Sequence, residues 1–404
     1  MYHGITTVRL FSKYYLYKKA ILIMNEFDDI RPYNDSEVAT VLAKLSKNSE
    51  FIDTLLSIKH PRLYRWLPWL ARPVISYALR SAFSKMKKVH DLHEAIRQSF
   101  GKLLIKTDSF LTISGLEKLD RKTPYLFISN HRDIAMDPAF LNVALIDDGR
   151  DTVRIAIGDN LLKKEFVSDL ARINKSFVVK RSIKGRREKL EAFTKLSRYI
   201  RYSLITDKCS VWIAQREGRA KNGLDRTEPA LLKMLTLSKE KSQNFGAALS
   251  ELNIVPVSIS YEFDPLDINK GMELAEKHKT GSYEKNEDED FLSIYKGIVG
   301  KKGAVHIAFG DILKKDYLSA DEAAHTIDKQ IIKNYKPHAT NLLAYHKLHK
   351  SNHKTEAMAA KLECDWAKIT DEFNLRIGAL EPMCKKIVLE MYANPIIQNI
   401  NQKQ

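Results

Sequence analysis

Short apolar runs alternate with longer helical patterns through the middle of this chain. The strand-like runs cover residues 125–129, 153–157, 176–179, 210–214, 254–260 and 304–309. The helical patterns between them cover residues 161–171, 185–203, 228–252 and 319–334. Continuous apolar runs that are joined by helices are typical of parallel strands buried on both faces. The alternation therefore predicts an α/β fold with a mostly parallel central sheet flanked by helices.

The two ends of the chain have helical patterns alone. We therefore expect an α/β domain at residues 101–335 between a helical N-terminal region (1–100) and a helical C-terminal region (336–404). The sequence after Met24 reads like the beginning of a domain, so a native start without residues 1–23 is one alternative.

Smaller features complete this outline of the α/β domain. The apolar residues 103–105 and 111–113 are predicted to be short strands on either side of a turn at Thr107 and Asp108. The polar, charged stretch 278–290 is predicted to be an exposed loop.

The net charge of the chain limits its partners more than its length does. Among 404 residues, the proportions of hydrophobic (44%) and charged (29%) residues are ordinary for a globular protein. The formal net charge of +16 is not ordinary. Such a charge attracts phosphorylated substrates, an acidic carrier protein, an anionic membrane surface or nucleic acid. The net charge alone does not identify which of these is the partner.

The cysteines and the hydropathy pattern indicate a compartment. Cys209, Cys364 and Cys384 are too few and too scattered for a disulfide framework or a zinc cluster, which favours a reducing cytosol. Cys209 precedes a strand-like run and is interpreted as a buried, inert thiol rather than a nucleophile. The sequence has no run of about 20 apolar residues, so no transmembrane helix is expected.

Two further stretches allow a functional and a plain structural interpretation. Residues 63–83 combine two tryptophans, three arginines and two prolines with apolar residues. This pattern is typical of segments at a membrane interface and equally of a helical hairpin packed on a domain. His346, His349 and His353 would share one helix face; a solvated basic helix is favoured over a metal site because lysines surround them and no carboxylate or thiol joins them.

A histidine and an aspartate follow the run at 125–129. Imidazole suits proton transfer near neutral pH, so His131 is a candidate general base. A carboxylate on its far ring nitrogen would fix the tautomer and stabilise the imidazolium. Asp137 and the nearer Asp133 are both candidates for that carboxylate.

This stretch resembles the first motif of the glycerolipid acyltransferases, which include glycerol-3-phosphate and lysophosphatidate acyltransferases. The family motif reads N-H-x4-D, often followed by proline. Asn130, His131, Asp137 and Pro138 fit it, with five intervening residues in place of four. The register Asp-Pro-Ala favours Asp137 over Asp133 as the motif's acidic residue.

The other motifs of that family have counterparts in the same order. The third motif resembles Glu217-Gly218-Arg219, with Lys221 as its second basic position. The second motif, a strand that ends in arginine, resembles residues 176–182. There Arg181, with Lys180 beside it, holds the matching position. The fourth motif, a strand centred on proline, resembles the run that contains Pro256. The resemblance covers about a third to a half of the chain.

The resemblance implies an O-acyltransferase of phospholipid synthesis. On this reading His131 takes a proton from a glycerol hydroxyl that attacks an acyl thioester, and Asp137 holds the imidazole. The phosphate of the acceptor would be bound by Arg181, Lys180, Arg219 and Lys221. Asn130, Gly218 and Glu217 would support the site, Glu217 by contacting the acceptor, by bracing the arginines or as a plain structural ion pair.

The implied co-substrate is acyl-CoA or acyl-acyl carrier protein, without a metal, a redox cofactor or an acyl-enzyme intermediate. The acceptor is 1-acylglycerol-3-phosphate or glycerol 3-phosphate, with a small preference for the former. The expected location is cytoplasmic, peripheral to the cytoplasmic membrane.

Two other functions are also compatible with the sequence. The extra residue between His131 and Asp137 suggests a catalytically silent membrane-surface protein with the acyltransferase fold. The basic charge alone would suit a nucleic-acid-binding protein. That function is disfavoured because the sequence has no helix-turn-helix signature, aromatic-rich RNA-binding strand or zinc knuckle.

Overall fold

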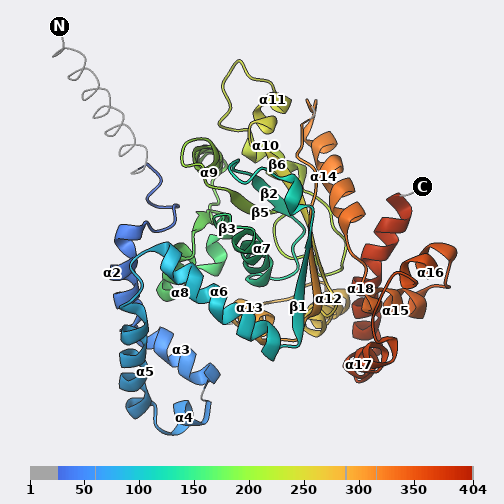
Figure 1. The fold of residues 1–404 in the computed structure, drawn as a ribbon, viewed down its shortest axis with the longest axis horizontal. Coiled ribbons are helices and arrows are strands. Elements are labelled where there is room, and N and C mark those ends of the chain that lie inside the picture. Colours follow the sequence, from blue (N-terminus) through green and yellow to red (C-terminus); the bar gives the residue numbers. More distant parts are fainter. Residues whose placement is uncertain (1–25, 60, 287–288, 315, 403–404) are drawn as a thin grey trace. The chain divides into compact units, whose positions relative to one another are not determined.

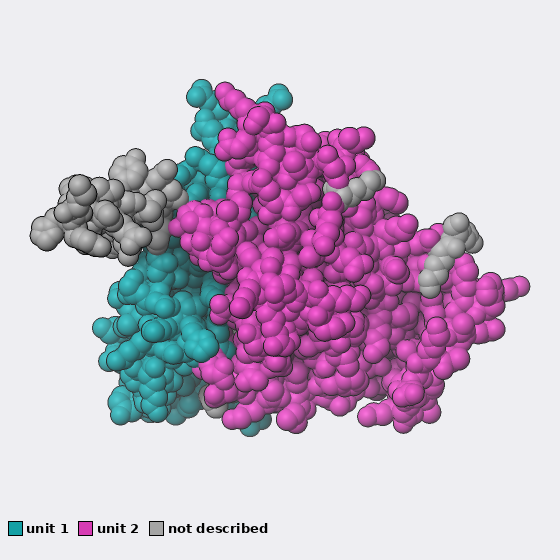
Figure 2. Space-filling model, turned by 45° about the horizontal axis from the view of Figure 1, so that its top comes forward, with its two compact units in different colours: residues 1–93, 156–200 teal, residues 94–155, 201–404 magenta. Residues whose placement is uncertain are grey.

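The computed structural model describes residues 26–59, 61–286, 289–314 and 316–402. It divides into two compact units, which are described separately: unit 1 contains residues 1–93 and 156–200, and unit 2 contains residues 94–155 and 201–404 (Figure 2). The three domains expected from the sequence stay a prediction.

A seven-stranded sheet in the order β1-β7-β6-β2-β5-β3-β4 forms the framework (Figure 1). The strands are β1 (Ser109–Ser114), β2 (Leu126–Ser129), β3 (Arg154–Gly158), β4 (Ser176–Val179), β5 (Val211–Ala214), β6 (Ile254–Tyr261) and β7 (Gly303–Phe309). The pairs β1–β7, β6–β2, β2–β5 and β5–β3 are parallel, and β6–β7 is antiparallel. The predicted α/β fold with a mostly parallel sheet is confirmed.

Helices precede, connect and follow the strands. In chain order they are α2 (Asp35–Leu45), α3 (Ser49–Lys59), α4 (Pro61–Trp66), α5 (Pro68–Phe83), α6 (Val89–Lys106), α7 (Met136–Asp147), α8 (Glu165–Ile173), α9 (Arg186–Ile205), α10 (Pro229–Leu235), α11 (Phe245–Ser250), α12 (Asp267–Thr280), α13 (Glu289–Val299), α14 (Ala320–Asn334), α15 (Ala339–Leu348), α16 (His353–Ala359), α17 (Trp366–Gly378) and α18 (Pro382–Gln402). Two short 3-10 helices are η1 (Leu116–Lys118) and η2 (Asp159–Leu161). The helices before β1 and after β7 confirm the predicted helical extensions.

The core of unit 2 surrounds β2. Every residue of β2 and of β6 is buried. Phe127 of β2 packs edge-on against Phe309 of β7, with ring centroids 5.5 Å apart. Phe140 of α7 packs in the same way against Phe100 of α6, at 5.2 Å. Each buried phenylalanine contributes about 1.5–3 kcal/mol, so this core holds the carboxyl end of β2 in place.

Three local predictions are wrong. Residues 103–105 form the last turn of α6 instead of a strand, because Leu103 and Leu104 turn one helical face to the core. Residues 228–252 form two helices, α10 and α11, with Asn244 capping the second through a 2.7 Å hydrogen bond from the Ala247 amide. The predicted loop at 278–290 is shorter, because α12 extends to Thr280 and α13 begins at Glu289.

Two buried histidines of unit 2 make stability depend on pH. His338 lies 3.1 Å from the Ser260 hydroxyl, and His306 lies between the hydroxyls of Thr112 (2.7 Å) and Ser114 (3.0 Å). Burial lowers the pKa of His338 to about 3 and the pKa of His306 to about 4. Both rings therefore stay neutral in the folded protein at pH values where an unfolded chain protonates histidine.

We expect the free energy of unfolding to fall as the pH drops from about 6.5 to about 4. Below about 6.5 the unfolded state binds protons that the folded state excludes, at a cost of up to about 1.4 kcal/mol per pH unit for each histidine. Urea denaturation at pH 7 and pH 5 measures this fall. His306→Gln keeps the hydrogen-bonding capacity of the side chain but removes the titrating group, so the free energy of unfolding of this variant should fall less between pH 7 and pH 5. An equal fall in the variant and the unsubstituted protein would show that His306 does not cause the pH dependence.

Candidate active site

The loop after β2 is tied to β6 by Asn130. The Asn130 side chain accepts a hydrogen bond from the Ile259 amide (2.7 Å) and donates one to the Ile259 carbonyl (3.0 Å). Its amide group also donates to Asp225 Oδ2 at 3.1 Å. The Asn130 side chain thus bonds to β6 as a neighbouring strand would. These bonds hold the backbone in position immediately before His131.

His131 forms a hydrogen-bonded pair with Asp137. The distance from His131 Nδ1 to Asp137 Oδ2 is 2.8 Å. The same oxygen accepts the backbone amides of Arg132 (2.7 Å) and Asp133 (3.0 Å), and Oδ1 accepts the Tyr261 hydroxyl at 2.6 Å. Burial of Asp137 disfavours its charge, but the hydrogen bonds from His131, Tyr261 and the backbone outweigh burial and lower the pKa of Asp137. The carboxylate is therefore ionised and acts only as an acceptor.

This arrangement sets the proton positions on the imidazole. Because Asp137 accepts, Nδ1 of His131 carries the proton and Nε2 has the free lone pair. Within the described residues, no hydrogen bond joins Nε2 to another protein group, and the His131 side chain is 13% exposed. The Trp212 ring packs edge-on against the imidazole, with centroids 5.5 Å apart. Nε2 is therefore available to accept a proton from a bound molecule.

Asp133 has a different position from Asp137. Its Oδ1 accepts the amides of Ala135 (3.0 Å) and Met136 (2.9 Å), at the start of α7. Burial, with the nearby charge of Asp137, raises the pKa of Asp133. Of the two carboxylates considered from the sequence, the structure pairs Asp137 with the histidine.

The loop after β5, which contains Arg219, is bonded to the backbone of His131. The Ala220 amide donates a hydrogen bond to the His131 carbonyl at 2.8 Å. Gly218 has φ +73°, a left-handed conformation that glycine adopts without steric cost, so the backbone turns sharply before Arg219. Arg219 Nη1 is buried and has no hydrogen-bond partner within the described residues. A buried guanidinium nitrogen without a partner is suited to receiving an anion.

The neighbouring predicted residues are placed differently. Lys221 forms an ion pair with Glu273 of α12, which also binds Lys277 at 2.9 Å. Burial lowers the pKa of Lys221, although Glu273 opposes that shift. Glu217 is exposed. Lys221 thus lies in the same loop as Arg219, but the carboxylate of Glu273 already compensates its charge.

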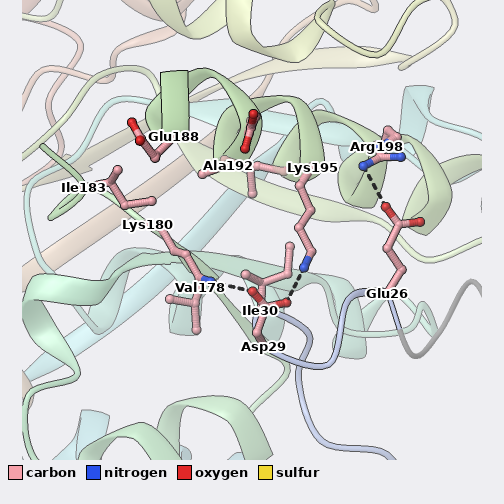
Figure 3. A pocket seen from close by; sticks show the side chains of 12 residues that line it. Glu26, Asp29, Ile30, Val178, Lys180, Ile183, Glu188, Ala192, Lys195 and Arg198 are labelled. Atoms are coloured by element: carbon pink, nitrogen blue, oxygen red, sulfur yellow. Dashed lines mark hydrogen bonds and ion pairs between the residues drawn. The ribbon is translucent and has the colours of Figure 1, made fainter. Parts of the chain in front are cut away.

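Lys180 and Arg181 belong to unit 1, whereas His131 belongs to unit 2. Lys180 lines a cavity of about 500 Å³ and forms an ion pair there with Asp29, which also binds Lys195 at 2.6 Å (Figure 3). Burial disfavours the charge of Asp29, but the two ammonium groups outweigh burial and lower its pKa. The Arg181 amide donates to Asp159 Oδ1 at 3.1 Å.

Several residues of the site were not predicted from the sequence. Arg132 is buried and donates to Asp225 Oδ2 at 2.7 Å, and Lys270 donates to the Arg132 carbonyl at 2.7 Å. Tyr261, which binds Asp137, is the last residue of the strand that contains Pro256. The only local signals were the adjacency of Arg132 to His131 and the position of Tyr261 at the end of a motif strand.

The candidate metal and thiol features lie outside this site. His346 is in α15, which ends at Leu348, and His353 begins α16, so the prediction that they share one helix face with His349 is wrong. Within the part of the chain that the structure describes, no three histidine, cysteine or acidic side chains are arranged to hold a metal ion. All three cysteines have free thiols.

Comparison with known proteins finds a family model that matches part of the chain. Residues 110–260 match the model of the family described as Acyltransferase, a range that includes His131, Asp137 and Arg219. No curated protein matches the chain. Among solved structures, the chain is similar to the crystal structure of the 1-acyl-sn-glycerophosphate (LPA) acyltransferase PlsC from Thermotoga maritima, with 13% identity and a TM-score of 0.35. That similarity covers 72% of this chain and 92% of that chain.

Proposed function

We propose that this chain, whose residues 110–260 match the acyltransferase family model, transfers a fatty acyl group from an acyl thioester to a hydroxyl of a glycerol phosphate in phospholipid synthesis. The acceptor is 1-acylglycerol-3-phosphate or glycerol 3-phosphate, and the donor is acyl-CoA or acyl-acyl carrier protein. The observation that carries the proposal is the His131–Asp137 pair, with Nε2 open and the Arg219 loop bonded to the His131 carbonyl.

The proposed reaction uses His131 first as a base and then as an acid. Nε2 accepts the proton of the acceptor hydroxyl while that oxygen attacks the thioester carbonyl. The carbon–sulfur bond then breaks, and the leaving thiolate takes the proton from the imidazolium. Asp137 stays ionised throughout and stabilises the imidazolium. No atom changes oxidation state and the acyl group moves directly to the hydroxyl, so neither a redox cofactor nor an acyl-enzyme is required.

Purified protein and a labelled acyl donor test this proposal. Incubation with acyl-CoA or acyl-acyl carrier protein plus either glycerol phosphate should yield a labelled ester, which chromatography of the lipid and aqueous products identifies. Release of the label only as free fatty acid would indicate a thioesterase instead, and no turnover with any donor–acceptor pair would favour the catalytically silent alternative.

In this proposal Arg219 binds the acceptor phosphate. Arg219→Ala should raise the KM for the phosphorylated acceptor about 10- to 100-fold, because a hydrogen bond to a charged group contributes about 1.5–3 kcal/mol. The change in kcat should be smaller. Arg226→Ala, which removes an exposed arginine from the same loop, is the matched control. Steady-state kinetics with varied acceptor decides; an unchanged KM in Arg219→Ala would remove Arg219 from the phosphate site.

We further propose that unit 1 binds an anionic membrane surface as a peripheral protein on the cytoplasmic side. Within the described residues, no helix combines the length and the apolar character that crossing a membrane requires. Helix α5 has one apolar stripe that packs in unit 1, through Ala71, Ile75 and Leu79. Most of its other apolar side chains are exposed, including Trp69 (66%) and Tyr77 (77%). Such an outward aromatic stripe near arginines suits the headgroup region of a bilayer.

Vesicle binding tests this location. Replacing Trp66, which is 75% exposed, and Trp69 together by alanine should lower the fraction that sediments with anionic phospholipid vesicles about 10-fold. Leu375→Ala, at an 83% exposed leucine of α17, is the control and should sediment like the unsubstituted protein. If the double variant binds as well as the control, the stripe is not the docking surface.

A further inference from the structure

We infer that the C-terminal helices α17 and α18 position the His131 loop, with Gln398 and Tyr392 as positioning residues. This inference rests on the proposed function, because it assigns a role in that reaction to helices outside the acyltransferase range 110–260. All residues involved lie in unit 2. Two chains of hydrogen bonds run from these helices to residues 130–132, and they approach His131 through different groups.

The first chain begins on one face of α18. Gln398 exchanges two hydrogen bonds with the backbone of Asp225, each 2.9 Å long. One turn earlier, Asn394 donates to the Asn222 carbonyl at 2.7 Å. Gly223 has φ +76°, and a Cβ at this position would lie 2.0 Å from the Met391 carbonyl oxygen. The loop at 222–225 therefore packs directly against α18.

Asp225 extends this chain to both neighbours of His131. Its Oδ2 accepts from Asn130 at 3.1 Å and from Arg132 at 2.7 Å. The Arg132 guanidinium also donates to the carbonyls of Ala220 and Gly223, at 3.3 Å each. His131 thus sits between two residues that share one carboxylate, and α18 holds the backbone of that carboxylate's residue.

The second chain runs through a buried lysine. Lys270 of α12 donates to the Arg132 carbonyl at 2.7 Å and forms an ion pair with Asp264. The Asp264 amide donates to the Tyr392 hydroxyl at 2.9 Å, and that hydroxyl donates to Asp267 at 2.8 Å. Arg376 of α17 also binds Asp267, at 2.8 Å. Figure 1 shows α12 beside α18.

The inner groups of both chains are buried, whereas Gln398 at the α18 end is half-buried, so water offers little replacement for a bond lost at the inner groups. Lys270 is 2% exposed, Asp225 3% and Tyr392 3%. A displacement of about 1 Å in a catalytic group lowers turnover about 100-fold even when the substrates still bind. The network therefore predicts that breaking it at α18 lowers kcat more than it changes the KM of either substrate.

The test compares neighbouring positions of α18. Gln398→Met removes both bonds to Asp225 and keeps the length of the side chain. Asn399→Leu is the matched control, because Asn399 is buried and donates to the Ile332 carbonyl of α14, away from the His131 loop. We expect kcat to fall about 10- to 100-fold in Gln398→Met, with little change in KM, and to stay near the unsubstituted value in Asn399→Leu. Tyr392→Phe, which removes one oxygen atom, should lower kcat in the same direction.

A second measurement separates this inference from the proposed function. In 15N-histidine-labelled protein, the Nδ1–H signal of His131 is identified by its loss in His131→Ala. That signal should shift or broaden in Gln398→Met and Tyr392→Phe but not in Asn399→Leu. If the protein has no acyltransferase activity, the proposed function fails and the signal still decides the positioning role. An unchanged signal with unchanged kcat in both Gln398→Met and Tyr392→Phe would overturn the inference.

Discussion

His131→Ala is expected to lower kcat for acyl transfer about 1000-fold. General acid–base catalysis contributes about 100- to 10,000-fold, and His131 would act both as the base for the hydroxyl and as the acid for the thiolate. The substitution leaves the hydrogen bond from the Ala220 amide to the backbone carbonyl of residue 131. The fold and the binding of the donor should therefore change little.

The control for this variant is His325→Ala, at an exposed position of α14. Steady-state kinetics and thermal unfolding of both variants separate a loss of chemistry from a loss of folded protein. If folded His131→Ala retains more than about a tenth of the original kcat, His131 is not the general base.

Asp137→Asn is expected to have the second largest effect, a fall in kcat of about 100- to 1000-fold. An amide has one acceptor oxygen, whereas Asp137 uses both carboxylate oxygens as acceptors, for Tyr261 and for three N–H groups including His131 Nδ1. The amide NH2 of asparagine would face either the Tyr261 hydroxyl or His131. If the NH2 group faces the imidazole, it donates to Nδ1 and favours the tautomer in which Nε2 carries the proton. In that tautomer Nε2 cannot act as a base.

Asp133→Asn distinguishes the two candidate carboxylates. The asparagine oxygen can still accept the amides of Ala135 and Met136, which Asp133 Oδ1 accepts now. We expect its kcat to stay within about threefold of the original, because Asp133 makes no hydrogen bond to the imidazole. Kinetics with both variants check the assignment, and a larger loss in Asp133→Asn than in Asp137→Asn would reverse it.

The sequence was most informative where local patterns determine structure. Strand β4 was predicted at its observed residues, 176–179, because a buried parallel strand is a short uninterrupted apolar run. The same signal misled at 103–105, where three apolar residues in a row belong to the end of α6. Residues 228–252 were predicted as one helical pattern, whereas α10 ends at Leu235 and Asn244 caps the start of α11.

The candidate site likewise contains residues that lie in local motifs and residues that only the fold brings to the site. His131, Asn130 and Arg219 lie in short motifs, so their residue types and spacing were enough to mark them as candidates. Tyr261, Asp225 and Lys270 come to the loop from positions about 90 to 140 residues further along the chain, and no local pattern marks such a contact.

The predicted basic residues show a second limit of sequence patterns. Lys180 and Lys221 were assigned to the phosphate site from their positions in the motifs, and the structure pairs them with Asp29 and Glu273. A sequence pattern cannot reveal that a distant carboxylate already compensates an ammonium group.

Matched acceptors test the central claim most directly. Initial rates of labelled acyl transfer are measured with glycerol 3-phosphate against glycerol, and with 1-acylglycerol-3-phosphate against 1-acylglycerol. The account predicts that at least one phosphorylated acceptor has a kcat/KM about 100-fold or more above its phosphate-free partner, and that Arg219→Ala removes most of the difference. Equal kcat/KM values within both pairs would contradict it, since the phosphate would then have no part in placing the hydroxyl at His131.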